Sequence, residues 1–201
     1  MFVRFSCELS LSRIAAQSPD VAAMHRQAES EALLLNYYNA RLPTIKVPES
    51  DTAEHAPSHA LLQAVSPWLL CRYKPINVAG DGNCLMRSIS HTLFGTEAAH
   101  VLLRLLCVIE VLRNRSFYDP AHADFYAPYK ADVWLKLPNF THFVICLSTL
   151  GAYCDMLGVL AASTVVQKAI QTWWPLSARP GEISPFTKLV IGRVSHIVVA
   201  Q

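Results

Sequence analysis

The chain has 201 residues, of which 52% are hydrophobic and 16% are charged. This composition excludes a mainly disordered chain, and the length suits one well-buried domain with a short extension. The formal net charge of +2 is small, and Lys and Arg form no cluster along the chain. We therefore expect no nucleic acid partner.

The cysteines indicate reduced thiols rather than a metal site. None of the six forms a C-x-x-C pair or has a histidine at zinc-finger spacing, so we expect no metal and no cofactor. The N-terminal stretch "MFVRFSCELSLSRIAAQ" carries Arg4 and Glu8 where a signal peptide needs its apolar core. This pattern predicts no secretory signal and favours a cytoplasmic or nuclear protein with free thiols.

The N-terminal part of the chain predicts one helix and a linker. Apolar residues recur on one face from about 19 to 41, with Ser18 as N-cap and Pro19 at the first helical position. A stretch with three prolines and mixed charge follows. We interpret 1–57 as a helix and linker appended to a domain at 58–201.

The rest of the chain predicts helices followed by strands. A short helix near 58–70 leads to an extended segment and turn. A helix is expected from Cys84 to Gly95, and a second one after Thr96, which would be its N-cap. Short helices are expected in 116–141, and two more helices near 141–149 and near 153–166. Strands are expected at 168–174, from 187, and at 196–200. This order predicts an α+β fold with a small central sheet flanked by helices.

A membrane span is the alternative for residues 143–166, which are long enough to cross a bilayer. Asp155 lies near the centre of this stretch, where a carboxylate costs about 2.5–3.5 kcal/mol. Gly151 also divides the stretch into two shorter runs. We therefore expect two buried segments and no membrane contact.

The stretch "GDGNC", residues 80–84, directly precedes a helical pattern and is the strongest chemical signal. A helix N-terminus favours the thiolate of a cysteine, and its free N–H groups can hold an oxyanion. Glycines on either side of Asp81 suit a tight turn that a substrate backbone can approach. The pattern predicts Cys84 as a nucleophile; a buried cysteine at a helix start is the alternative.

"GDGNCLMRSISHTLFG" resembles the catalytic-cysteine motif of the ovarian tumour (OTU) family of cysteine proteases, in its divergent vertnin-like branch. The matching residues are Asp81, Gly82, Asn83, Cys84, Leu85 and Arg87, whereas Met86 stands where an aromatic residue is usual. "GAYCDMLGVLAASTVVQKAIQTWWP" and "SPFTKLVIGR" are also similar to family segments, so the resemblance covers roughly 72–199. It implies an OTU-like cysteine protease fold of the α/β type.

The resemblance also suggests the other site residues. It implies His196 as the base, although Ile197 and Val198 replace the aromatic residue and the Asn or Asp that often follow it. His91 lies about 10 Å of helix rise from Cys84, which is too far. Asp81 would join the catalytic set by shaping the oxyanion site through its backbone, with Gly82 and Asn83 forming the turn. The residue that would orient the histidine is not identifiable.

These residues lead to two functional hypotheses. The first is a thiol isopeptidase that removes ubiquitin or a ubiquitin-like modifier from proteins, with that modifier as its partner. The second is an OTU-fold binding module that keeps the cysteine turn but lacks a competent base; the altered surroundings of His196 favour it.

Overall fold

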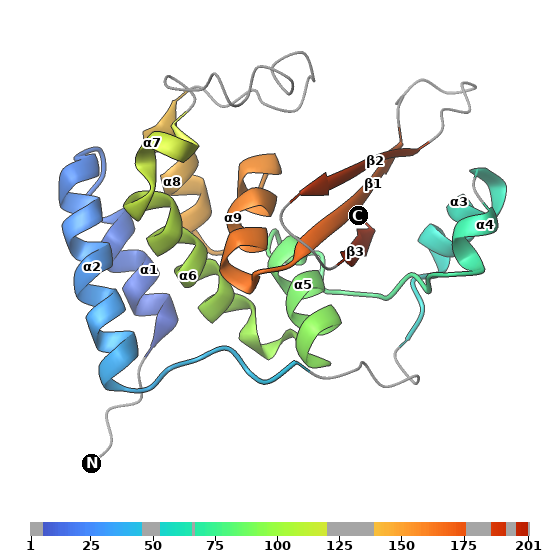
Figure 1. The fold of residues 1–201 in the computed structure, drawn as a ribbon, viewed down its shortest axis with the longest axis horizontal. Helices are drawn as coiled ribbons and strands as arrows, with labels where there is room; N and C mark the ends of the chain where they lie inside the picture. Colours follow the sequence, from blue (N-terminus) through green and yellow to red (C-terminus); the bar gives the residue numbers. More distant parts are fainter. Residues whose placement is uncertain are drawn as a thin grey trace.

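The computed structural model of the chain is predominantly helical (Figure 1). It describes residues 6–45, 53–65, 67–119, 139–175, 186–191 and 196–200, and only the backbone of the strands from residue 171 onward.

The N-terminal region contains two helices, α1 (Cys7–Ala15) and α2 (Val21–Tyr37). Ser6 caps α1 by accepting a hydrogen bond from the backbone N–H of Leu9. Asp20 caps α2 in the same way through Ala23, so the expected cap at Ser18 was wrong by two residues. The sequence analysis missed α1, whose buried side chains are Ser10, Leu11 and Ile14.

Both N-terminal helices pack into the main core of the protein. Their buried apolar residues belong to one cluster with those of α6 (His100–Arg113) and α8 (Phe140–Ser148), and Figure 1 shows the four helices side by side. The apolar face of α2 is therefore covered by the rest of the chain. The main core therefore contains residues from both sides of the boundary expected at residue 57.

Glu31 joins α1 to α2 from a fully buried position, 0% exposed. Its carboxylate accepts hydrogen bonds of 2.7 Å from the Ser10 hydroxyl, from Nε of Arg13 and from Gln27. Burial alone would raise the pKa of Glu31, but these hydrogen bonds, that from Arg13 foremost, lower it below its usual range.

A smaller unit lies at the opposite end of the molecule. Helices α3 (Ala56–Val65) and α4 (Pro67–Leu70) bury Leu62 and Leu69 in an apolar cluster of their own. A single antiparallel bridge between Glu54 and Ile76 pairs the segment before α3 with the segment after α4. Figure 1 places this pair of helices beyond the strands and away from α1 and α2. We call residues 53–73 the α3–α4 unit.

The helix boundaries around the cysteine motif follow the local sequence. Helix α5 (Cys84–Phe94) begins at Cys84 and ends where Gly95 adopts a left-handed conformation with φ +69°. Thr96 then caps the short helix η1 (Glu97–Ala99) by accepting a hydrogen bond from Ala98 N–H, and α6 follows directly. The short helix α7 (Arg115–Tyr118) lies in the stretch where short helices were expected. The expected aromatic loop at 120–138 lies outside the described residues.

Helices α8 and α9 (Met156–Val166) account for the apolar stretch considered as a membrane span. Asp155 caps α9, since its carboxylate accepts hydrogen bonds from the N–H groups of Leu157 and Gly158. Burial raises the pKa of this carboxyl group, which the two hydrogen bonds partly oppose. In the described part of the chain, no helix is both long and apolar enough to cross a bilayer.

Three strands follow α9: β1 (Ala169–Pro175), β2 (Phe186–Ile191) and β3 (His196–Ala200). Their order is β2-β1-β3, with β1 antiparallel to β2 and parallel to β3. Strand β3 packs against α5, and β1 and β2 pack against α9. The predicted helices are confirmed in their order, whereas the role of the sheet as the centre of the fold remains a prediction.

Candidate functional site

Cys84 is the first residue of α5 and is partly exposed. The turn before it is closed by a hydrogen bond of 3.0 Å from the backbone N–H of Asn83 to Oδ1 of Asp81. Gly82 has φ +77°, a conformation that L-amino acids with a side chain rarely adopt. The structure therefore places the thiol at a helix N-terminus after a tight turn.

Asp81 forms an ion pair on the outer side of this turn. Nη2 of Arg87 lies 2.6 Å from Oδ2 of Asp81, and Nη1 lies 3.1 Å from Oε2 of Glu97. The hydrogen bonds from Arg87, with those from Asn83, hold the pKa of Asp81 well below its usual range. The Asp81 side chain is thus engaged with Arg87 and its own turn.

A second turn, between α8 and α9, fits against the cysteine turn. Oδ1 of Asn83 accepts a hydrogen bond of 3.1 Å from the backbone N–H of Gly151. The two glycines Gly82 and Gly151 face each other so closely that a Cβ on Gly82 would overlap the Gly151 carbonyl group. Glycine at position 82 is therefore required both by its φ and by the neighbouring backbone.

Arg104 donates hydrogen bonds to the backbone of both turns. This residue of α6 is 0% exposed. Its Nη2 donates to the carbonyl oxygens of Gly82 (3.2 Å) and Ala152 (3.1 Å). Its Nη1 lies within hydrogen-bond distance of three carbonyl oxygens at the end of α8 and in the turn after it, those of Cys146, Leu147 and Thr149. The buried Arg104 guanidinium thus fixes the backbone of the turn that directly precedes Cys84.

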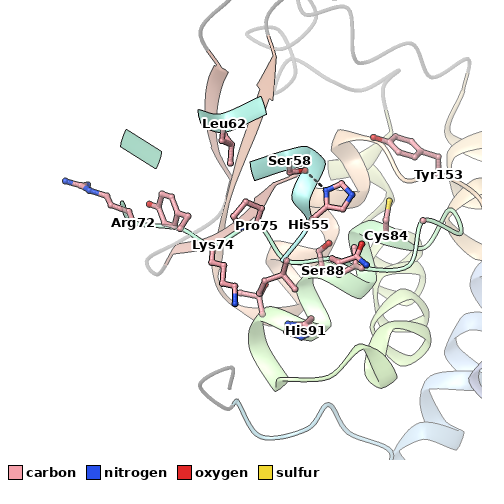
Figure 2. A pocket seen from close by; sticks show the side chains of 16 residues that line it. His55, Ser58, Leu62, Arg72, Lys74, Pro75, Cys84, Ser88, His91 and Tyr153 are labelled. Atoms are coloured by element: carbon pink, nitrogen blue, oxygen red, sulfur yellow. Dashed lines mark hydrogen bonds between the residues drawn. The ribbon is translucent and has the colours of Figure 1, made fainter. Parts of the chain in front are cut away.

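A cleft of about 740 Å³ lies beside Cys84 (Figure 2). Ser88 and His91 of α5 line one wall, and the α3–α4 unit supplies His55 and Ser58. Tyr153, 58% exposed, also lines the cleft. Figure 2 shows His55 and Tyr153 toward the Cys84 end of the cleft and His91 further along α5. A substrate segment in this cleft would pass the thiol.

His196, the predicted base, is the first residue of β3. Its backbone pairs with Ala169 of β1, and β3 packs against the helix that Cys84 begins. The direction of its imidazole lies outside the described side chains, so its distance from the thiol stays a prediction. His91 lines the same cleft as Cys84, although it is too far along α5 to take the thiol proton directly.

The sequence analysis missed Arg104, His55 and the contact between the two turns. An arginine between leucines in the apolar helix "VLLRLLCVIEVL" is a signal of a buried, hydrogen-bonded charge. His55 gave no such signal, because it lies in the proline-containing linker assigned outside the domain. Nowhere in the described ranges do three potential metal ligands come together.

Comparisons with known proteins agree with the geometry of the cysteine turn. Residues 75–144 match the family described as "Vertnin, OTU domain". The matched part holds the cysteine turn and Arg104, and the match bears out the predicted resemblance to the vertnin-like branch of the OTU family. His196 lies beyond the matched residues.

Among solved structures, the chain is similar to the OTU domain of OTUD1. The two are 22% identical, the alignment covers 71% of this chain and 91% of that chain, and the TM-score is 0.48. A comparison with curated proteins finds no match.

Proposed function

We propose that the protein is a thiol isopeptidase that removes ubiquitin or a ubiquitin-like modifier from other proteins. The observation that carries the proposal is the position of Cys84, at a helix N-terminus and on the wall of an open cleft. The OTU family match over the cysteine turn supports the same assignment.

The turn offers what a cysteine hydrolase needs for its first step. A helix N-terminus stabilises a thiolate, and the backbone N–H of Cys84 can stabilise the oxyanion that forms when sulfur attacks a carbonyl carbon. Arg104 fixes the Gly82 carbonyl and with it the orientation of this backbone. An acyl-enzyme would form on Cys84 and then be hydrolysed by water.

A ubiquitin probe with a C-terminal electrophile tests the proposal. We expect the wild-type protein to form a covalent adduct that is absent from Cys84→Ala, with the modified residue identified by mass spectrometry. Cys71→Ala is the matched control, because Cys71 is exposed and lies in the α3–α4 unit. No adduct with ubiquitin or related modifier probes, from a folded protein, would contradict the isopeptidase proposal.

A binding module is the second candidate, and two observations favour it. The Asp81 carboxylate is held by Arg87 and by its own turn, so it does not serve to orient a histidine. Val198 also stands where an Asn or Asp often follows the family histidine. A binding module would retain non-covalent affinity for ubiquitin in both the wild type and Cys84→Ala, with no adduct in either.

A further inference from the structure

The Arg104 guanidinium is buried in the core without a carboxylate partner. None of the ion pairs among the described residues includes it, and its Nε is buried there with no hydrogen-bond partner. Moving a charge out of water is costly, so the carbonyl oxygens that accept from its two Nη atoms must offset that cost. The position of these carbonyls therefore indicates what the residue does.

The acceptors belong to the cysteine turn and to the turn that packs against it, residues 149–152, which we call the α8–α9 turn. Nη2 donates to Gly82 in the first (3.2 Å) and to Ala152 in the second (3.1 Å). Nη1 donates to Leu147 at the end of α8 (3.1 Å) and to Thr149 (3.2 Å). Helix α6 packs against α5, α8 and α9, so this guanidinium lies where the helices that carry both turns meet.

Asn83, directly before the thiol residue, is held on several sides at this junction. Its backbone N–H donates within the cysteine turn at 3.0 Å, and its side-chain Oδ1 accepts from the N–H of Gly151 at 3.1 Å. Arg104 fixes the Gly82 carbonyl, which belongs to the same peptide group as the Asn83 N–H. The N–H of Cys84 donates no hydrogen bond within the described ranges, as is usual in the first turn of a helix.

We infer that Arg104 is a positioning residue for the attack of Cys84 on a carbonyl carbon. By joining Gly82 to Ala152, it holds the cysteine turn in the orientation that presents the Cys84 N–H to the oxyanion. The inference rests on the part of the proposed function that makes Cys84 a nucleophile. It extends the site to α6 and to the α8–α9 turn.

Two reactions of the same thiolate distinguish this role from general support of the fold. When the sulfur attacks an ester or amide carbonyl, the oxygen takes the electron pair as an oxyanion. The C=O bond then re-forms, the leaving group departs, and a thioester remains on Cys84; with an amide, the thiol proton leaves on the amine. Alkylation by iodoacetamide displaces iodide from a saturated carbon and forms no oxyanion. Only the first reaction depends on the orientation of the Cys84 N–H.

The test compares both reactions in Arg104→Lys, which keeps the charge but lacks the planar fork that reaches two turns. p-Nitrophenyl acetate acetylates the thiolate and releases p-nitrophenolate, and mass spectrometry measures the acetylated fraction of Cys84. We expect acetylation to slow about tenfold or more, because loss of a whole oxyanion donor costs about 10²–10³ in rate. Alkylation should stay close to the wild-type rate, since Cys84 remains at a helix N-terminus, and the pH dependence of both reactions should be unchanged.

Arg113→Lys is the matched control, because it makes the same change on the same helix. The Arg113 side chain pairs with Glu29 of α2 at 2.7 Å and donates to neither turn. Both rates should equal those of the wild type.

Asn83→Ala tests the same junction without altering a buried charge. It removes the hydrogen bond to the Gly151 N–H, which is the other link between the two turns. We expect the same selective slowing of acetylation. If Arg104→Lys does not fold, the rates of Asn83→Ala decide the matter by the same criterion.

The outcomes separate this inference from the proposed function. Unchanged acetylation in Arg104→Lys overturns the inference, and so does an equal slowing of both reactions, because that indicates a general loss of structure. Acetylation of Cys84 without a ubiquitin adduct in the wild type contradicts the isopeptidase proposal and leaves the inference standing. Wild-type Cys84 that is acetylated no faster than the exposed Cys71 overturns both.

Discussion

Gly82→Ala is expected to destabilise the protein and to displace the turn that carries Cys84. Holding alanine at φ +77° costs about 1–2 kcal/mol. The new Cβ would also overlap the Gly151 carbonyl, so one of the two turns must move. That movement would break the hydrogen bond between Asn83 and Gly151, at a further cost of about 0.5–1.5 kcal/mol.

The sum, about 1.5–3.5 kcal/mol, should lower the melting temperature by about 3–14 °C in a chain of this size. Calorimetry or circular dichroism measures this directly, and the Cys84 alkylation rate reports the displaced turn. Gly80→Ala is the matched control, since a Cβ there meets no heavy atom within 4 Å. Equal melting temperatures for the two variants would refute the proposed contact between the turns.

Two further predictions concern buried charges. Arg104→Met should cost at least about 3 kcal/mol in urea unfolding, because it leaves the buried Leu147 carbonyl and partly buried carbonyl groups in both turns without a donor. Arg104→Lys should lose less, and a Met variant as stable as the wild type would contradict this role. Glu31→Gln should flatten the acid side of the stability profile. The pKa of Glu31 is lowered in the folded protein, so its ionised carboxylate stabilises the folded state above the pKa that Glu has in the unfolded chain, and this stabilisation is lost as pH falls through the folded pKa. The free energies of unfolding of wild type and variant should therefore converge in acid. A constant difference between them down to about pH 2 would contradict this prediction.

Where an element begins or ends could be predicted wherever neighbouring residues decide it. Gly95 ends α5 because glycine adopts the left-handed conformation at little cost, and Thr96 caps the next turn through its own hydroxyl. The position of Cys84 at a helix start followed in the same way from the turn-forming residues before it. These outcomes depend on interactions within a few residues, which the sequence displays directly.

Helix α1 shows where local reasoning failed. Its short apolar pattern was considered only as part of a possible signal peptide, and its stability depends on burial of Leu11 and Ile14 in the main core. The two partners of Glu31 on α1, Ser10 and Arg13, are likewise 21 and 18 residues away from it in the sequence. Burial against distant segments, rather than helix propensity, stabilises such a short helix.

The sequence by itself determined the cysteine motif, its place at a helix start and its resemblance to the OTU family. Only the tertiary structure decided what surrounds it. Gly82 and Arg104 are 22 residues apart, Asn83 and Gly151 are 68 residues apart, and His55 reaches the cleft from a unit with its own core. Contacts of this kind depend on how whole helices pack, and no local pattern encodes which distant backbone group a side chain will meet.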